Sequence, residues 1–264
     1  MIRPDFTFDE LIYPLTDEVF QNTVKDKKPI VIRANAEKQE FFGNIITWDD
    51  ISKYVANDRA VAGLQMITVG GKKLCMEKDN LHQIPKPAWT KNDWYQKDLV
   101  TRIWSSGGSM ILTKASMLSP NISAVANCLE ERYKNSAADA HFYCSPKKEA
   151  RSFECHADQD DNFLVHAIGS VRWKVYNTFA RSEKDDNGRR RFTGRMTMTE
   201  EDELKHELII DTVLTVGDLL YIPAGMFHKA TPESARVSIS VPLSENSSSK
   251  PIDRSYHDFT KNNS

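Results

Sequence analysis

The spacing of apolar and polar positions along the chain changes near residue 139. Before that point, apolar residues recur at helical spacing from Trp48 to Val55 and from Ile122 to Leu129, and a period of 3.6 residues is typical of helices with one buried face. Ser119 and the proline after it provide a capping side chain and an early proline for the second helix, which we predict to run through Arg132. Thr16, followed by two acidic residues, predicts another helix start.

Short strands also interrupt this helical part of the chain. Lys28–Arg33 and Ser109–Thr113 are runs of β-branched and apolar residues, which favour strands. Gly70-Gly71 separates residues 64–69 from residues 73–76, and a glycine pair between two such runs predicts a hairpin. Strands are therefore expected among the helices of the first half.

After residue 139 the pattern becomes one of short strands separated by glycine and proline turns. We predict strands at residues 140–144, 152–158, 162–168, 171–176, 207–213, 217–223 and 236–243. Many short, evenly spaced strands indicate a mainly β fold with flanking helices, a double-stranded β-helix or jelly roll of the cupin type. We expect one structural domain overall: a helix-rich layer with the first strands (1–138), a catalytic core (139–243) and a flexible polar tail (244–264).

A charged segment, residues 178–203, separates two predicted strands of the core and includes Arg189-Arg-Arg191. The composition fits an exposed insertion. Two readings stay open: a solvated loop, or a lid that faces a substrate.

Composition narrows the function classes. The net charge of -2 in 264 residues provides no basic field for nucleic acid, and no apolar run of about 18 residues predicts a membrane helix. The N-terminus has no apolar signal-peptide core. The four cysteines lack a C-x-x-C pair, so a disulfide framework or zinc site is not expected and a cytoplasmic location fits. Cys155 is expected to pack in the core.

Candidate chemistry lies in Phe153-Glu-Cys-His-Ala-Asp158 and Tyr221-Ile-Pro-Ala-Gly-Met-Phe-His228. In a strand, His156 and Asp158 would point to the same face because they are two residues apart. The turn at Pro223 would redirect the chain toward His228. Two histidines and one carboxylate can form a facial triad that leaves open positions on non-haem Fe(II). The alternative for the pair alone is an ordinary hydrogen bond at a strand end.

These motifs resemble those of the JmjC and cupin-4 oxygenases, and most of all the ribosomal oxygenases. The resemblance covers residues 6–243. The residues that carry it are His156-Ala-Asp158, Asn162-Phe-Leu-Val, Gly169-Ser-Val-Arg-Trp-Lys-Val-Tyr176, Gly217-Asp-Leu-Leu-Tyr-Ile-Pro-Ala-Gly-Met-Phe-His228 and the early strand Lys28-Pro-Ile-Val-Ile-Arg33.

The resemblance implies an oxygenase that uses Fe(II), 2-oxoglutarate and O2, with His156, Asp158 and His228 as the metal ligands. In such enzymes 2-oxoglutarate is decarboxylated to succinate, and the usual product is a hydroxylated protein, peptide or amino-acid-like substrate. The alternative is a metal-dependent cupin enzyme that does not use 2-oxoglutarate. The oligomeric state is not predicted.

One position departs from the family pattern. Much of the family places a lysine or arginine, which pairs with the distal carboxylate of 2-oxoglutarate, where this chain has Val171. Arg236 and Ser238 are our candidates to replace it, because a guanidinium matches a carboxylate with two hydrogen bonds. Tyr143 matches a family tyrosine that approaches the co-substrate. In the alternative, Val237, Ile239 and Val241 form the core face, which leaves Arg236 and Ser238 in water.

Two further features bear on the site and the substrate. His166 stands where the family usually has glutamine, and we do not expect it to bind the metal. The ribosomal oxygenases carry dimerisation and winged-helix regions after the catalytic domain, whereas this chain ends some twenty residues after its last predicted strand. A ribosomal substrate is therefore possible but not supported by the sequence.

Overall fold

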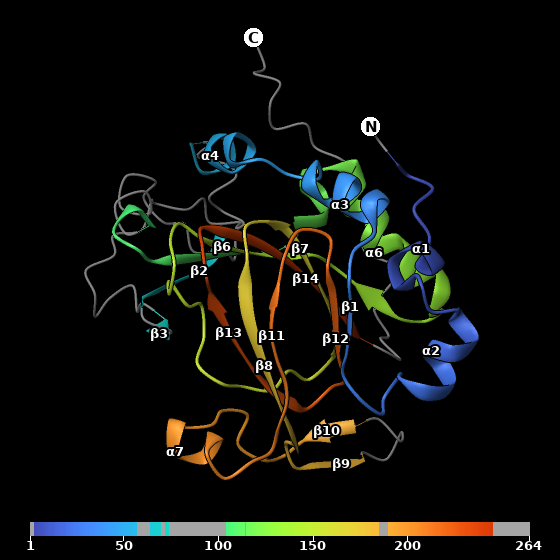
Figure 1. Ribbon diagram of the computed structural model, residues 1–264, viewed down its shortest axis with the longest axis vertical. Helices are drawn as coiled ribbons and strands as arrows, with labels where there is room; N and C mark the ends of the chain where they lie inside the picture. Colours follow the sequence, from blue (N-terminus) through green and yellow to red (C-terminus); the bar gives the residue numbers. More distant parts are fainter. Residues whose placement is uncertain are drawn as a thin grey trace, which may run out of the picture.

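Two antiparallel sheets packed face to face form the frame of the protein (Figure 1). The computed structural model describes residues 3–56, 64–69, 72–73, 104–113, 115–184 and 190–244. The described helices are α1 (Phe8–Ile12), α2 (Asp17–Thr23), α3 (Ala36–Gly43), α4 (Trp48–Ala56), α6 (Pro120–Arg132) and α7 (Glu200–Glu203), with a 3-10 turn at Ala115–Leu118. The described strands are β1 (Ile30–Ile32), β2 (Leu64–Val69), β3 (Lys72–Lys73), β4 (Ser109–Leu112), β5 (Ala137–Ala138), β6 (His141–Ser145), β7 (Asp161–Ile168), β8 (Val171–Phe179), β9 (Ser182–Lys184), β10 (Arg190–Phe192), β11 (Leu208–Leu214), β12 (Leu219–Ile222), β13 (Met226–Pro232) and β14 (Arg236–Ser244).

The larger sheet has the strand order β1-β12-β7-β14-β6-β4-β2-β3, and β5 also pairs with β14. The smaller sheet has the order β11-β8-β13. Chain segments from both halves of the sequence thus join one sheet, since β1 pairs with β12 and β4 pairs with β6. This arrangement is the double-stranded β-helix that the strand pattern predicted.

The core has an outer and an inner layer on either side of the larger sheet. The outer layer packs this sheet against α1, α2, α3 and α6, which lie together on one side of the molecule (Figure 1). The inner layer fills the space between the sheets with Leu164, Val171, Trp173, Val175 and Leu220 among its members. Because strands such as β7 and β14 are covered on both faces, nearly all of their side chains are buried.

The helix signals of the sequence correspond to observed caps. The Thr16 side chain accepts a hydrogen bond from the Val19 amide, and Ser119 caps α6 in the same way, with Pro120 in its first turn. The buried face of α6 includes Asn121, Ile122, Val125 and Leu129.

The hairpin prediction is confirmed for β2 and β3, which pair antiparallel, whereas residues 74–76 lie outside the described residues.

The predicted strand at residues 152–158 is wrong. This segment is irregular, and of its residues only His156 forms isolated β-bridges, to His228 and to Thr197. The side chains of His156 and Asp158 therefore converge through the shape of a loop, not through the alternation of a strand. We call residues 153–158 the ligand loop.

The insertion at residues 178–203 contains regular secondary structure among its described residues. It forms the β9–β10 hairpin and α7 at one end of the small sheet (Figure 1). Most of its described side chains are exposed, but Ala180 and Met198 are buried against Cys155 and Phe227. Cys155 packs as expected, with its Sγ 3.9 Å from Met198 Sδ.

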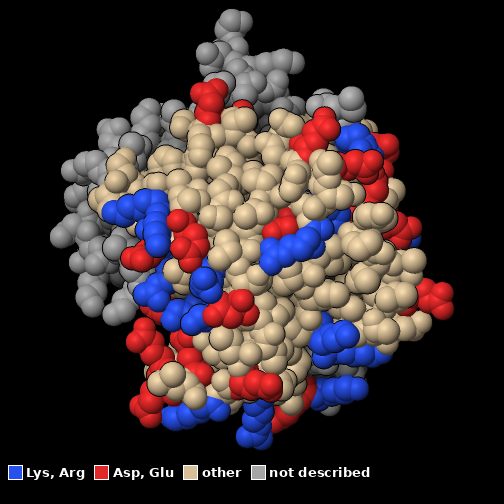
Figure 2. All heavy atoms as spheres, viewed as in Figure 1, with Lys and Arg blue, Asp and Glu red and all other residues tan. Residues whose placement is uncertain are grey.

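Surface features agree with the composition. Figure 2 shows acidic and basic side chains interspersed on the face in view. Among the described residues, no helix is long and apolar enough to cross a membrane. The last strand extends one residue into the predicted tail, to Ser244, and residues 245–264 lie outside the described part of the chain.

A glycine turn between β7 and β8 provides a test of the fold. Gly169 has a φ of +74°, and a Cβ there would lie 2.0 Å from the carbonyl oxygen of Ala235. We expect Gly169→Ala to lower the free energy of unfolding by about 2 to 4 kcal/mol in urea denaturation. Gly43→Ala is the control, because its Cβ would lie 3.4 Å from Val216 Cγ1 at the end of a helix. Equal stability of the two variants would contradict this account of the turn.

Candidate metal centre

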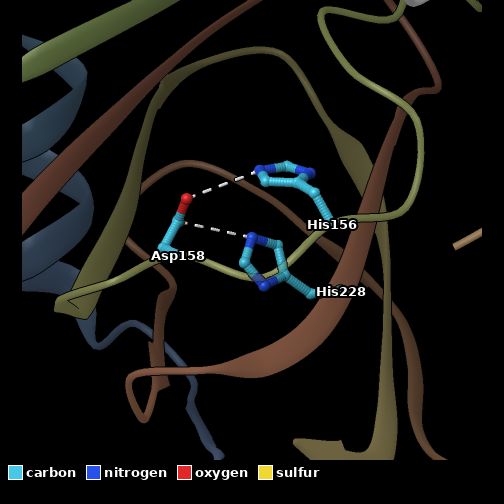
Figure 3. A group of neighbouring side chains, drawn as sticks. All are labelled: His156, Asp158 and His228. Atoms are coloured by element: carbon cyan, nitrogen blue, oxygen red, sulfur yellow. Dashed lines mark ion pairs between the residues drawn. The ribbon is translucent and has the colours of Figure 1, made fainter. Parts of the chain in front are cut away.

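Three side chains from two separate segments converge between the sheets (Figure 3). The Nε2 atom of His156 lies 3.6 Å from Asp158 Oδ1, and the Nε2 atom of His228 lies 3.5 Å from Asp158 Oδ2. Each residue offers one ligand atom, and these atoms all lie within 4.8 Å of one another. His156 and Asp158 belong to the ligand loop and His228 to β13, so the structure brings together the three residues that the sequence singled out.

The tautomer of each histidine is set by a backbone carbonyl. His156 Nδ1 lies 2.9 Å from the carbonyl oxygen of Glu154, and His228 Nδ1 lies 3.0 Å from that of Met226. A carbonyl oxygen only accepts, so both Nδ1 atoms carry the hydrogen and both Nε2 lone pairs face Asp158. Such a partner on the second ring nitrogen is typical of metal-binding histidines.

The protonation states also suit metal binding at neutral pH. Loss of water around Asp158 would raise its pKa, but the neighbouring His228 and His156 and the hydrogen bond from Asn162 hold the pKa of Asp158 well below its usual value. Burial and the neighbouring His228 lower the pKa of His156. The set therefore consists of a carboxylate anion and neutral imidazole, the forms that coordinate a cation.

Backbone hydrogen bonds fix the ligand loop on both sides. His156 and His228 exchange two of them, with N–O distances of 3.0 and 2.8 Å. On the other side of the loop, the Ala157 amide donates to Met196 O at 2.9 Å and the Met198 amide donates to Cys155 O at 3.0 Å. The insertion thus adds a short strand-like segment to the outside of the ligand loop and supports it.

The Asp158 carboxylate is held by a side-chain relay from the larger sheet. Asn162 Nδ2 donates to Asp158 Oδ2 at 3.0 Å, and the Ser240 hydroxyl donates to Asn162 Oδ1 at 2.8 Å. The Gly225 amide donates to the backbone oxygen of Asp158 at 2.7 Å. Asp161 accepts from the Ala224 amide at 2.7 Å and so braces the same turn. The carboxylate and the turn are therefore both held by side chains of the larger sheet.

A pocket opens beside the triad and encloses about 380 Å³, including its open mouth. Tyr143 and Phe153 pack edge to face in its wall, with ring centroids 6.2 Å apart, and Phe153 also packs against His156. Burial raises the pKa of Tyr143, so its hydroxyl stays protonated. The residues that line the pocket are Tyr143, Ser152, Phe153, His156, Asp158, Asn162, Leu164, Trp173, His228, Ala230 and Arg236.

Arg236 lies at the inner end of this pocket with 1% of its surface exposed. Its Nη1 donates to Ser238 Oγ at 2.7 Å and its Nη2 to Ser152 Oγ at 3.4 Å. Its Nε has no hydrogen-bond partner, and no Asp or Glu among the described residues forms an ion pair with the guanidinium. Burial lowers the pKa of Arg236 to about 10, so it remains a cation at neutral pH.

The position that departs from the family pattern is filled by core packing. Val171 is buried between the sheets, whereas Arg172 is exposed and pairs with Asp211 and Glu233. The reading in which Arg236 and Ser238 face water is wrong, because helices cover the opposite face of β14 and the small sheet covers this one. Both faces of β14 are therefore buried.

The sequence reasoning missed residues that act behind the triad. Asn162 and Ser240 were not singled out as partners of Asp158, and Ser152 was not placed beside Arg236. The alternation of Arg236, Ser238 and Ser240 along β14 was a usable signal, since it gives one polar face to a strand whose other face is apolar. Ser152 lies in an irregular segment just before the ligand loop, and no periodic pattern in the sequence marks it.

The JmjC domain matches residues 112–250. "Ribosomal oxygenase 1" of Danio rerio is 26% identical over 230 residues, which cover 86% of this chain and 38% of that protein. "Bifunctional lysine-specific demethylase and histidyl-hydroxylase NO66" of Drosophila pseudoobscura pseudoobscura is 24% identical over 241 residues, which cover 90% of this chain and 23% of that protein.

A solved structure shares the fold. The Escherichia coli ribosomal oxygenase YcfD in complex with cobalt and 2-oxoglutarate superposes with a TM-score of 0.53 at 18% identity, over 91% of this chain and 53% of that one. The chain thus spans well under half the length of the two curated relatives and about half of the solved one. Because the domain match extends over more than half of its residues, the chain belongs to the JmjC domain family.

Proposed function

We propose that this protein is an Fe(II)- and 2-oxoglutarate-dependent oxygenase that hydroxylates an unactivated C–H bond of a protein, peptide or amino-acid side chain. One observation carries the proposal: a His-Asp-His set with both Nε2 lone pairs free shares a pocket with a buried guanidinium that has no counter-ion among the described residues. Membership of the JmjC domain family supports it.

The residues fit the metal. Two neutral imidazoles and one carboxylate on one side are the donor set of non-haem Fe(II) oxygenases. His156, Asp158 and His228 would hold the ion, and the carbonyl partners on Nδ1 would keep the imidazoles oriented toward it. His166 does not compete for the ion, because it lies behind the pocket and hydrogen-bonds through both ring nitrogens.

The residues also fit the co-substrate. A buried cation is costly unless an anion pairs with it, and Arg236 has an unpartnered Nε–H. The distal carboxylate of 2-oxoglutarate would supply that charge from inside the pocket. Arg236 on β14 thereby would replace the basic residue absent at Val171, with Ser238 and the Tyr143 hydroxyl beside it. The alternative, a cupin enzyme without 2-oxoglutarate, provides no reason to bury this charge.

The chemistry comes from the bound groups and the positioning comes from the chain. Bound Fe(II) and 2-oxoglutarate would supply oxygen activation, with succinate and carbon dioxide as the products of the co-substrate. Asn162 and the two backbone carbonyls hold the ligands in place, and Arg236 fixes one end of the co-substrate. Phe153 and Trp173 line the pocket with apolar surface that excludes water.

The substrate class rests on the relatives. Their names describe a ribosomal oxygenase and a lysine-specific demethylase and histidyl-hydroxylase. These names support a protein or peptide substrate for this chain. The pocket opens beside His156 and Asp158, whose side chains are about a quarter and a third exposed, so a side chain of a larger substrate can reach the triad.

Removal of a triad ligand tests the metal. We expect Asp158→Ala and His156→Ala to lose Fe(II) binding and to lower succinate formation by about 100-fold or more, because two ligands cannot hold the ion in an open site. Calorimetric titration with Fe(II) under argon and a succinate assay are the measurements. Asp211→Ala is the matched control, since it removes an exposed carboxylate that pairs only with Arg172. Full Fe(II) affinity in Asp158→Ala would refute the assignment.

Removal of the guanidinium tests the co-substrate. We expect Arg236→Met to weaken 2-oxoglutarate binding by about 30-fold or more while Fe(II) affinity is retained, because a buried charge-assisted hydrogen bond is lost. The measurement is the visible charge-transfer band of the anaerobic Fe(II)–2-oxoglutarate chelate. Arg172→Met is the control, an exposed arginine on β8 of the smaller sheet. Iron binding without any band in the wild type would favour a cupin enzyme with different chemistry.

A further inference from the structure

Behind the pocket, a chain of hydrogen bonds runs from Trp173 to Arg236. Trp173 Nε1 donates to His166 Nε2 at 3.2 Å, His166 Nδ1 lies 3.0 Å from Ser238 Oγ, and Arg236 Nη1 donates to the same oxygen at 2.7 Å. His166 and Ser238 are directly opposed on β7 and β14. Both are fully buried, so each of these groups depends on its protein partners.

Elementary donor and acceptor rules determine the direction of every bond in this chain. An indole N–H only donates, so His166 Nε2 must accept. The neutral ring then carries its hydrogen on Nδ1 and donates to Ser238 Oγ. A guanidinium also only donates, so Ser238 Oγ accepts twice. Its own hydroxyl hydrogen therefore remains for a further acceptor, and no hydrogen bond among the described residues uses it.

We propose that His166 is a positioning residue for the co-substrate carboxylate: held by Trp173 as the Nδ1–H tautomer, it turns Ser238 into a donor beside Arg236, so that the subsite presents only donors and selects a dicarboxylic 2-oxo acid. This inference rests on the proposed function. It assigns to His166 a role that acts through Ser238 and not through the metal.

The surroundings of Arg236 agree with a donor-only subsite. Ser152 Oγ accepts from Arg236 Nη2 and lies 2.7 Å from Ser109 Oγ, which in turn donates to the carbonyl of Cys144. Hydrogen bonds on this branch therefore also run away from the guanidinium. A carboxylate, which only accepts, complements such a site, whereas a neutral end group leaves the buried cation unpaired.

Burial keeps His166 in the required state. Desolvation, reinforced by the charge of Arg236, lowers the pKa of His166 to about 3. The ring is therefore neutral across the physiological range, and Nε2 remains free to accept from Trp173. If the ring were protonated, its Nε2–H would point at the Trp173 Nε1–H, and the two donors could not form a hydrogen bond.

Two variants and two ligands separate this role from a merely structural one. His166→Gln can preserve the chain, because its amide oxygen can accept from Trp173 and its amide nitrogen can donate to Ser238. His166→Leu removes both bonds at similar bulk. The probes are Fe(II) with 2-oxoglutarate and Fe(II) with 2-oxobutyrate, which chelates the metal in the same way but lacks the distal carboxylate. Anaerobic titration of the charge-transfer band measures the affinity for each acid.

We expect His166→Leu to weaken 2-oxoglutarate binding by about 10-fold or more, the effect of losing one aligned donor to a charged group. Affinity for 2-oxobutyrate should stay within about twofold of wild type, and His166→Gln should restore most of the 2-oxoglutarate affinity. The double variant His166→Leu/Ser238→Ala should lose no more than Ser238→Ala alone, because both changes remove the same hydrogen bond. In metal-free protein, the ¹H–¹⁵N correlation of the His166 ring should show the Nδ1–H tautomer.

Distinct results overturn the inference and the proposed function. An equal loss for both acids, an unchanged affinity in a folded His166→Leu protein, or an Nε2–H tautomer would overturn the role of His166 while the wild-type band still supports the enzyme class. A wild type that binds Fe(II) but gives no band with either acid would overturn the proposed function itself.

Discussion

The buried positive charge of Arg236 is the constraint on which the arrangement of the interior depends. The core has two layers, one on each side of the larger sheet, and apolar side chains in both layers would give the fold a higher stability. Here β14 presents Val237, Ile239 and Val241 to the helices and a polar stripe to the space between the sheets. That stripe is tolerated because Ser238, Ser152 and their partners satisfy most of its hydrogen bonds.

The metal centre depends on backbone pairing more than on regular secondary structure. His156 and His228 exchange two backbone hydrogen bonds, yet His156 does not belong to a regular strand. The loop can bend at this point and bring Asp158 back toward both imidazoles, at 3.6 and 3.5 Å. Residues 196–198 of the insertion pair with the outside of the loop. The insertion is therefore part of the support of the centre, and Glu203 links it to the small sheet through Tyr176 and Lys229.

The two halves of the candidate site share one architectural principle. One group in each half is held by side chains on the larger sheet: Asp158 by Asn162 and Ser240, and Arg236 by Ser238 and His166. Both relays connect β7 with β14, which are neighbours in that sheet. A rigid pair of strands can thus position the metal ligands and the co-substrate anchor relative to each other.

The sequence by itself determined the local and periodic features. Short runs between glycine and proline turns predicted β7, β8 and β14, capping residues predicted α2 and α6, and the His-x-Asp and distal His motifs predicted the triad, because each depends only on residues close along the chain or on a family pattern. Only the tertiary structure decided that residues 152–158 form a loop, since its hydrogen bonds go to β13 and to the insertion. Tertiary packing likewise decided the surroundings of the polar face of β14. From the sequence this face could meet a co-substrate or water, and the layers that cover β14 made one face an apolar interface and the other the wall of a pocket.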